Sequence, residues 1–267
     1  MKRPIITLLT DFGLRDHFVG VMKGVILGIC PEAAIVDITH DLAPHAVDEG
    51  AFVLGSACPY FPAGTVHVAV VDPGVGGSRR PLAARCDEHF FVGPDNGILS
   101  YAFAQAGEWQ AVAITNPECR LPKLSATFHG RDVFAPAAAH LAAGVALEVL
   151  GEVVDGPVLI KLPTPRETPQ GLQAHVLHVD RFGNLVTDLR QERLADWLGE
   201  ASPADIVIEA GPVRLRGIMS SYEAAPPGSA LALIGSAGRL EIAISRRSAS
   251  HVLGLNRGDS IWLRKAG

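Results

Sequence analysis

Residues 66–80 read Val-His-Val-Ala-Val-Val-Asp-Pro-Gly-Val-Gly-Gly-Ser-Arg-Arg, an apolar run that ends in an aspartate, a turn and two arginines. Such a run predicts a strand that is buried on both faces, as in a sheet covered by helices. Ligands bind beyond the carboxyl ends of such strands, so Asp72 is the first candidate for a catalytic residue. Asp-Pro-Gly is also a common turn sequence, which leaves a purely structural role open. The glycines could bring Arg79 back over the carboxylate, and no Gly-Lys-Ser/Thr follows to make a phosphate-binding loop.

The first half of the chain alternates strand-like with helix-like stretches. Apolar residues recur at helical spacing over 18–29, and two more helices are expected at 47–57 and 133–141. Gly20, Gly24 and Gly28 recur every four residues in the first helix, which suggests close packing of its backbone against the sheet. The pattern is typical of an α/β domain with a mixed sheet flanked by helices. Strands are expected at residues 5–9, 35–38, 66–71, 82–86, 90–92 and 111–114.

The composition changes after residue 156. Prolines stand at positions 157, 163, 165 and 169, and proline at this density forms a stiff connector and ends helices. We therefore predict two domains, an N-terminal α/β domain over 1–167 and a C-terminal small antiparallel β-barrel domain over 168–267. Short strands are expected in the second domain at residues 174–179, 205–208, 213–215, 230–234, 240–244 and 260–263.

Length and charge limit the classes of function. The 267 residues are 48% hydrophobic and 19% charged, with a formal net charge of -5, which describes a compact globular protein. No basic surplus exists to neutralise phosphates, so we expect no nucleic-acid partner. No apolar stretch reaches the length of a membrane span, so we expect no membrane partner either. The N-terminal apolar run ends in an acid without a cleavage site, and we interpret it as the first strand rather than a signal peptide.

Cysteine and histidine spacing gives no sign of a metal site. Cys30, Cys58, Cys86 and Cys119 lie far apart without a Cys-x-x-Cys pair, which suggests reduced, buried thiols and a cytoplasmic location. None of the ten histidines stands at His-x-x-x-His spacing, so we expect no bound metal. A Gly-x-Ser-x-Gly sequence for a nucleophilic serine is also lacking.

Two carboxylates follow the first expected strand, in Thr-Asp-Phe-Gly-Leu-Arg-Asp over 10–16. Asp11 stands where a ligand would dock, and a carboxylate can accept two hydrogen bonds from the hydroxyls of a ribose. Alternatively, Asp11 stabilises a turn and Asp16 caps the helix that follows.

A histidine stands in Thr-Phe-His-Gly-Arg-Asp over 127–132, just before the third expected helix. His129 could move a proton near neutral pH, although a histidine beside a phenylalanine is often a packed core residue. Gly130 would let the backbone approach a ligand. Gly-Pro-Asp-Asn-Gly over 93–97 is a turn by composition.

The second half contains Asp-Arg-Phe-Gly-Asn over 180–184, at the end of an expected strand. Asp180 and Asn184 could contact an ammonium or carboxylate group, and Phe182 could lie on a flat base. The alternative is an ordinary hairpin turn around Gly183 and Asn184.

Together, Thr-Asp-Phe-Gly, Val-Asp-Pro-Gly-Val-Gly, Gly-Pro-Asp-Asn-Gly, Phe-His-Gly-Arg-Asp and Asp-Arg-Phe-Gly-Asn resemble the S-adenosyl-L-methionine hydroxide adenosyltransferase family, which is related to the fluorinase and chlorinase. The resemblance runs from about residue 5 to the end of the chain, with all five motifs in order. The resemblance implies an N-terminal α/β domain, a C-terminal β-barrel and hydrolysis of S-adenosyl-L-methionine to adenosine and L-methionine. It places the groups that orient and activate water on Asp72, Arg79 and His129.

The resemblance also implies how the substrate is bound. Asp11 would hold the ribose, Asp16, Asp180 and Asn184 the methionine end, and Phe182 would lie on the adenine. Further adenine contacts are expected around Ser236 and Ala249, where the chain departs from its relatives, which often read Asn-x-Gly at 245–247. S-adenosyl-L-methionine is the substrate and no cofactor is expected. The family forms homotrimers with active sites between neighbouring subunits, and a homotrimer is expected here.

Two other functions stay open at this point. Halogenating relatives carry a tyrosine at the position of Asp72, a tryptophan near His45 and, in the fluorinase, a hydroxyl side chain at Gly130. A chlorinase-type enzyme would form a 5′-halo-5′-deoxyadenosine from the same substrate. A non-catalytic binder of S-adenosyl-L-methionine or adenosine would keep Asp11, Asp180 and Asn184 and tolerate the loss of His129.

Overall fold

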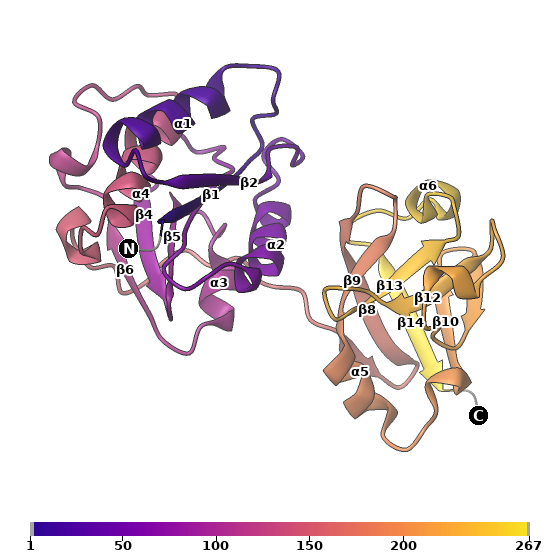
Figure 1. Cartoon of the computed structure of the whole chain (residues 1–267). Helices are drawn as coiled ribbons and strands as arrows, with labels where there is room; N and C mark the ends of the chain where they lie inside the picture. Colours follow the sequence, from indigo (N-terminus) through magenta and orange to yellow (C-terminus); the bar gives the residue numbers. More distant parts are fainter. Residues whose placement is uncertain (1–2, 266–267) are drawn as a thin grey trace. The chain divides into compact units, whose positions relative to one another are not determined.

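The computed structural model describes residues 3–265, which form two compact units (Figure 1). The first unit runs to Leu162 and the second begins at Pro163. The proline-rich composition predicts the boundary between residues 167 and 168. The contacts place it earlier because strand β7 (Arg166–Thr168) pairs with β8 (Gly171–Val179) and so belongs to the second unit.

Unit 1 contains a six-stranded mixed sheet in the order β2-β1-β3-β5-β4-β6. β1 is parallel to β2 and β3, β3 is parallel to β5, and β4 is antiparallel to β5 and β6. The predicted α/β fold with a mixed sheet is therefore confirmed. The bounds are β1 Ile5–Thr10, β2 Ala34–Thr39, β3 Val66–Val70, β4 Pro81–Cys86, β5 His89–Pro94, β6 Trp109–Ala113, α1 Phe18–Ile29, α2 Val47–Ala57, α3 Ser100–Gln105 and α4 Ala135–Ala142.

Two apolar clusters cover the two faces of this sheet, which explains why β3 is buried on both faces. Val66, Val68 and Val70 point into the cluster that contains residues of α1 and α4. Ala69 and Val71 point into the opposite cluster, which contains residues of α2 and α3. All five residues of β3 are buried, as the mostly apolar run predicts, and the one polar side chain, His67, lies 2.8 Å from Oγ1 of Thr7 through its Nδ1 atom.

The glycine repeat in α1 does not pack against the sheet, so that prediction is wrong. Gly20, Gly24 and Gly28 are exposed, and a Cβ atom added at any of them would meet nothing within 4 Å. The helix instead buries Val19, Met22 and Ile26. At 3.6 residues per turn these apolar residues lie on the face opposite the glycines.

Unit 2 is an antiparallel, nearly closed barrel with the strand order β11-β10-β14-β8-β9-β13-β12. A bridge between Met219 and Leu233 connects the segment after β11 to β12 and brings the two ends of the sheet together. The predicted C-terminal barrel is confirmed. The remaining bounds are β9 Leu185–Arg190, β10 Ile206–Ala210, β11 Val213–Arg216, β12 Ala230–Ile234, β13 Arg239–Ile244, β14 Ser260–Lys265, α5 Gln191–Leu198 and α6 Ala249–Leu253.

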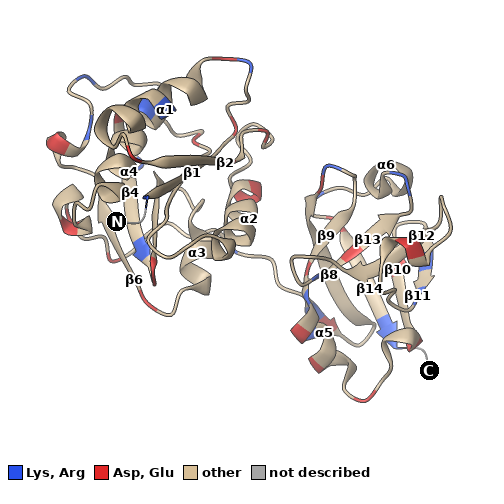
Figure 2. Cartoon of the chain, in the orientation of Figure 1, with Lys and Arg blue, Asp and Glu red and all other residues tan. Residues whose placement is uncertain are grey.

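Charged residues lie mainly in loops and near the ends of elements in both units (Figure 2). Within residues 3–265, none of the helices is both long and apolar enough to cross a bilayer.

Candidate active site

Asp72 and Arg79 stand at the two ends of the loop that joins β3 to β4. The Nε atom of Arg79 donates to Oδ1 of Asp72 at 3.0 Å, and Nη2 donates to Oδ2. The two side chains are only 5% and 10% exposed, respectively. The pair is therefore bidentate and shielded from water, which makes it both stronger and better oriented than a surface ion pair.

His129 joins this pair from the segment before the third expected helix. Nη2 of Arg79 lies 2.8 Å from Nδ1 of His129. A guanidinium can only donate, so Nδ1 accepts and the hydrogen of the neutral ring sits on Nε2. Burial, and then the charge of Arg79, lower the pKa of His129 below its usual value, against the opposing charges of Asp72 and Asp132. The structure thus unites Asp72, Arg79 and His129 around one guanidinium.

The loop between Asp72 and Arg79 contacts the segment that precedes His129. Gly76 has a φ of +75°, and a Cβ atom there would lie 2.2 Å from the carbonyl oxygen of Ala126. Only glycine permits this approach without strain. A single π-helical turn, Gly130–Phe134, follows His129. The guanidinium carbon of Arg79 lies 5.3 Å from the centre of the Phe134 ring. The glycine-rich sequence therefore fits one active-site loop against the other.

Asp11 lies at the same edge of the sheet as Asp72. It follows β1, whose last residue Thr10 pairs in register with Val70 of parallel β3. The carboxylate of Asp11 accepts a hydrogen bond of 2.9 Å from the backbone of His45, which has a φ of +66°. Asp11 is thus held by a neighbouring loop rather than by the side chains of the Arg79 cluster.

Asp16 is exposed and lies just before α1. The residue at the cap position of that helix is His17, which makes no capping hydrogen bond through its side chain. The alternative in which Asp16 caps the helix is therefore wrong. The structure shows no bond from Asp16 to the Asp72, Arg79 and His129 group.

In unit 2, Asp180 and Asn184 form the hairpin turn between β8 and β9. Oδ1 of Asp180 accepts from the backbone of Phe182 at 2.9 Å and of Asn184 at 2.8 Å, and Oδ2 accepts from Nδ2 of Asn184 at 2.9 Å. The hairpin-turn alternative is right as a description of the backbone. The turn nevertheless leaves Phe182 78% exposed, at the wall of a pocket.

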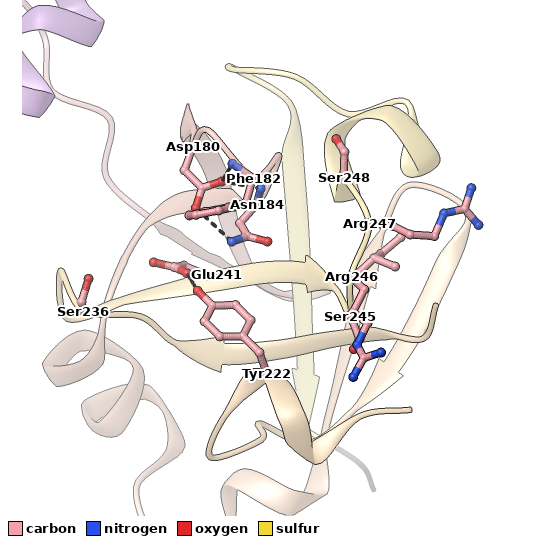
Figure 3. A pocket seen from close by; sticks show the side chains of 11 residues that line it. Asp180, Phe182, Asn184, Tyr222, Ser236, Glu241, Ser245, Arg246, Arg247 and Ser248 are labelled. Carbon is pink, nitrogen blue, oxygen red and sulfur yellow. Dashed lines mark hydrogen bonds between the residues drawn. The ribbon is translucent and has the colours of Figure 1, made fainter. Parts of the chain in front are cut away.

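That pocket has a volume of about 700 Å³ and lies entirely in unit 2 (Figure 3). Ser236 lines it from the turn between β12 and β13. Ala249 does not line it, because its methyl group is fully buried in the core of the barrel, but the preceding Ser248 does. The lining residues are Asp180, Phe182, Asn184, Tyr222, Ser236, Glu241, Ile244, Ser245, Arg246, Arg247 and Ser248.

Tyr222 and Glu241 line this pocket, and the sequence analysis predicts neither of them. Tyr222 donates its hydroxyl hydrogen to Oε2 of Glu241 at 2.8 Å (Figure 3). Burial and the neighbouring charge of Asp180 raise the pKa of the Glu241 carboxyl, against the hydrogen bond from Tyr222. An acid inside the apolar run 240–244 was a usable signal for Glu241, since a buried carboxylate needs a reason. Nothing in its local sequence distinguished Tyr222.

The candidate residues therefore form two groups. Unit 1 brings together Asp72, Arg79 and His129, with Asp11 on the neighbouring strand end. Unit 2 brings Asp180, Phe182, Asn184 and Ser236 to one pocket. Among the described residues, no cluster of three or more histidine, cysteine, aspartate or glutamate side chains could hold a metal ion.

Comparison with known proteins covers both units. The SAM hydroxide adenosyltransferase N-terminal domain matches residues 6–151, and the corresponding C-terminal domain matches residues 174–262. A relative from Salinispora arenicola named (R)-S-adenosyl-L-methionine hydrolase is 42% identical, covering 97% of each chain. The fluorinase of Nocardia brasiliensis is more distant at 27% identity, over 98% of this chain and 97% of its own.

A solved structure agrees with the fold. An uncharacterized conserved protein from Thermotoga maritima superposes with a TM-score of 0.91 at 36% identity, covering 97% of this chain and 100% of that one. The matches of both domains, in order and over nearly the full length, show that this chain belongs to the SAM hydroxide adenosyltransferase family.

Proposed function

We propose that this protein hydrolyses S-adenosyl-L-methionine to adenosine and L-methionine by in-line attack of water at C5′. Membership of the family and the full-length similarity to a named hydrolase support the substrate and the reaction. The observation that carries the mechanism is the Arg79 guanidinium, which binds the carboxylate of Asp72 and Nδ1 of His129 at once.

The hydrogen bonds of this group support Asp72 as the acceptor of the proton. Nδ1 of His129 already accepts from Arg79, so the ring can hold the attacking water only by donating from Nε2. Each oxygen of Asp72 accepts one bond from Arg79 and keeps a further acceptor site. Asp72 therefore takes the proton of the water, the water oxygen bonds to C5′, and the electron pair of the C5′–S bond leaves with the sulfur of methionine.

Positioning should contribute more than proton transfer. The sulfonium is already a good leaving group, so the main task is to hold water in line with the C5′–S bond. Orientation can lower a barrier by about 7 to 11 kcal/mol, whereas a general base contributes about 10² to 10⁴-fold in rate. The buried, bidentate Asp72–Arg79 pair suits that task because neither side chain can rotate freely.

Substrate binding divides between the two groups of residues. We assign the ribose to Asp11, the methionine end to Asp16, Asp180 and Asn184, and the adenine to Phe182. The pocket of about 700 Å³ in unit 2 has an exposed aromatic ring and hydrogen-bonding groups on its wall, as such a ligand requires. Ser236 can contribute its hydroxyl, whereas Ala249 could contribute only its backbone because its side chain is buried.

We further propose a cytoplasmic homotrimer in which unit 1 of one subunit and unit 2 of its neighbour share each site. The resemblance to the family supports this assembly, and the division of the candidate residues between two compact units is consistent with it. Four buried cysteines without disulfides suit a reducing compartment. We expect no cofactor or metal to be required, so activity should persist after dialysis against EDTA.

Two alternatives make different predictions. In the chlorinase-type alternative a halide would have to approach Asp72, whose negative charge repels it. A non-catalytic binder would hold the substrate unchanged, and it would not need the arrangement of Asp72 and His129 around Arg79.

One experiment separates the three functions. The protein is incubated with the R and S sulfonium epimers of S-adenosyl-L-methionine, with and without chloride, and the products are separated by chromatography. Adenosine release that is independent of chloride and lost in Asp72→Ala and His129→Ala supports hydrolysis. Formation of 5′-chloro-5′-deoxyadenosine would favour the halogenase, and tight binding of unchanged substrate would favour the binder.

A further inference from the structure

The loop that carries Asp72 and Arg79 connects β3 to β4 and passes over the end of β5, the strand between them. The order β3-β5-β4 places β5 between the two strands that the loop connects. β3 is parallel to β5, and β4 is antiparallel to it, so the end of β3, the end of β5 and the start of β4 meet at one edge. Asp95 and Asn96 follow β5 directly and therefore stand between the two stems of the loop.

Asn96 holds the first stem. Its Nδ2 donates to the carbonyl oxygen of Val71 at 2.8 Å, one residue before Asp72. Its Oδ1 accepts from the backbone of Ile98 at 3.2 Å, which fixes the side-chain amide in place. The carbonyl of Val71 is thus tied to a rigid turn rather than to a strand partner.

Asp95 holds the second stem. Its backbone donates to the carbonyl of Arg80 at 2.9 Å, and its Oδ2 accepts from Nε of Arg80 at 2.7 Å, one residue after Arg79. The carboxylate is 1% exposed, so this ion pair is well shielded on the acid side. Both residues that flank the Asp72–Arg79 pair are therefore tied to neighbouring positions of one turn.

The same turn also anchors the start of the connector between the units. Oδ1 of Asp95 accepts from the backbone of Val158 at 2.7 Å, and Nη2 of Arg80 donates to the carbonyl of Gly156 at 2.7 Å. A turn that served only to end β5 would not need three such bonds from one carboxylate and its partner arginine.

We propose that Asp95 and Asn96 form a clamp that sets the separation and orientation of Asp72 and Arg79, and that Asn96 is a positioning residue for the reaction. The inference rests on the proposed hydrolysis for its kinetic effect, but its structural part does not. Without the bond from Asn96 the carbonyl of Val71 is free to turn, and Asp72 moves with it. The carboxylate then no longer holds water in line, whereas the substrate contacts in unit 2 stay intact.

The test uses Asn96→Asp in the full-length protein, with Asn116→Asp as a matched control. Aspartate keeps the acceptor oxygen for Ile98, but it replaces the donor to Val71 by a second acceptor and adds a negative charge. The control variant adds the same charge. Asn116 makes the same pair of bonds in another loop of unit 1. Its Nδ2 donates to the carbonyl of Val149 at 2.8 Å, and its Oδ1 accepts from the backbone of Glu118 at 3.0 Å. The control therefore reports the general cost of this change away from the active site.

We expect Asn96→Asp to lower kcat about 10- to 100-fold with KM within about 3-fold of the unaltered protein, since small misplacements of reacting groups are costly. Amide hydrogen exchange of residues 71–80, followed by mass spectrometry, should become faster in Asn96→Asp and stay unchanged in Asn116→Asp. A kcat equal to that of Asn116→Asp, a change confined to KM, or unchanged exchange in 71–80 would overturn the proposal.

A second variant keeps the proposal testable if Asn96→Asp does not fold. Arg80 is 44% exposed, so Arg80→Ala leaves no cavity in the core. It removes the side-chain bonds of the second stem, keeps the backbone bond to Asp95, and is followed with the same two readouts. If the unaltered protein released no adenosine at all, the proposed function would fail while hydrogen exchange would still decide whether the clamp exists.

Discussion

At the scale of single residues, the proposed mechanism gives Asp72 the role of proton acceptor. We predict that Asp72→Asn lowers kcat by about 10² to 10⁴-fold, because the amide preserves the shape of the carboxylate but cannot accept a proton. KM should change little, since Asp72 contacts the water rather than the parts of the substrate bound by unit 2. Steady-state release of adenosine measures both constants.

Asp205→Asn is the matched control for that substitution. Asp205 is an exposed aspartate before β10 whose carboxylate lies 3.8 Å from Nη2 of Arg216, outside the candidate active site. Its variant should retain full turnover. Equal kcat values for the two variants would contradict a role of Asp72 in proton transfer.

The pH dependence follows from the neutral state of His129. Burial and the charge of Arg79 lower the pKa of His129 below 6.5, so the ring is neutral above that pH and gains a proton only in more acidic solution. Protonation at Nδ1 would break the bond from Arg79 and release the water. Activity should therefore rise with pH through a value below 6.5 and then stay level towards pH 8.

The free energy of unfolding should follow the same trend as activity. Below pH 6.5 the unfolded chain binds a proton at His129 more readily than the folded chain does, so the protein becomes less stable as the pH falls. A profile of kcat/KM from pH 4.5 to 8 checks the predicted rise of activity with pH. An acid limb centred at or above pH 6.5 would show that the ring is not held neutral by its surroundings.

Residue roles were only partly predictable from the sequence. The position of Asp72 after a mostly apolar run predicts a role in the site. The glycines that follow it suggest that the chain folds back and brings Arg79 close to Asp72. His129 depended on the resemblance to the family, because one histidine beside a phenylalanine is not distinctive. Tyr222 reaches the pocket only through the packing of the barrel, which no local pattern encodes.

At the scale of elements, the hairpin between β8 and β9 fixes one wall of the pocket. Gly183 has a φ of +82°, and a Cβ atom there would lie 2.1 Å from Oγ of Ser248. We predict that Gly183→Ala raises KM for S-adenosyl-L-methionine at least about 10-fold, because the hairpin must move away from Ser248 and carries Phe182 with it. Isothermal titration with adenosine gives the same comparison without turnover.

Gly64→Ala controls for backbone strain. Gly64 also has a φ of +82°, but a Cβ atom there meets nothing within 4 Å. Both variants should lose about 1 kcal/mol or somewhat more of folding free energy through the left-handed backbone. Weakened adenosine binding in both, or in neither, would contradict the role of the hairpin.

Elements with a strong periodicity can be predicted from the sequence, whereas those set by tertiary packing cannot. β3 follows from a mostly apolar run and α1 from a clear helical repeat. β9 has no such signal because Asp188 interrupts its apolar run, and only the fold reveals that the backbone and ring of His175 both bind this carboxylate. The glycine repeat of α1 has a helical period, but the period alone does not tell which face of the helix packs against the sheet.

At the scale of the whole molecule, the proposed trimer predicts complementation between two inactive proteins. Asp72→Asn disables unit 1 and Asp180→Ala disables the pocket in unit 2. If each site combines unit 1 of one subunit with unit 2 of its neighbour, some mixed trimers contain an intact site. An intact site needs unit 1 from an Asp180→Ala chain and unit 2 from an Asp72→Asn chain. With random mixing in equal amounts each occurs half the time, so the mixture should recover roughly a quarter of full activity.

The mixture is prepared by joint refolding or co-expression, and its mass is measured by light scattering. We expect a particle of three chains of 28.2 kDa each. A mixture with no more activity than its components would mean that each site lies within one chain. A monomeric mass would rule out the trimer directly.

The overall architecture was largely predictable because two different periodicities occur in succession. Helical and strand patterns alternate in the first part, whereas short strands and turns fill the second. The prolines predict a boundary after residue 167, whereas the compact units divide after Leu162. The two positions differ because β7 lies among the prolines and a three-residue strand leaves no periodic signal.

In the proposed reaction, water attacks C5′ of S-adenosyl-L-methionine. Turnover in water enriched in oxygen-18, followed by mass spectrometry of both products, tests this step. We expect one heavy oxygen in the 5′-hydroxyl of adenosine and none in L-methionine. Unlabelled adenosine, or labelled homoserine with 5′-methylthioadenosine, would show that water does not attack C5′.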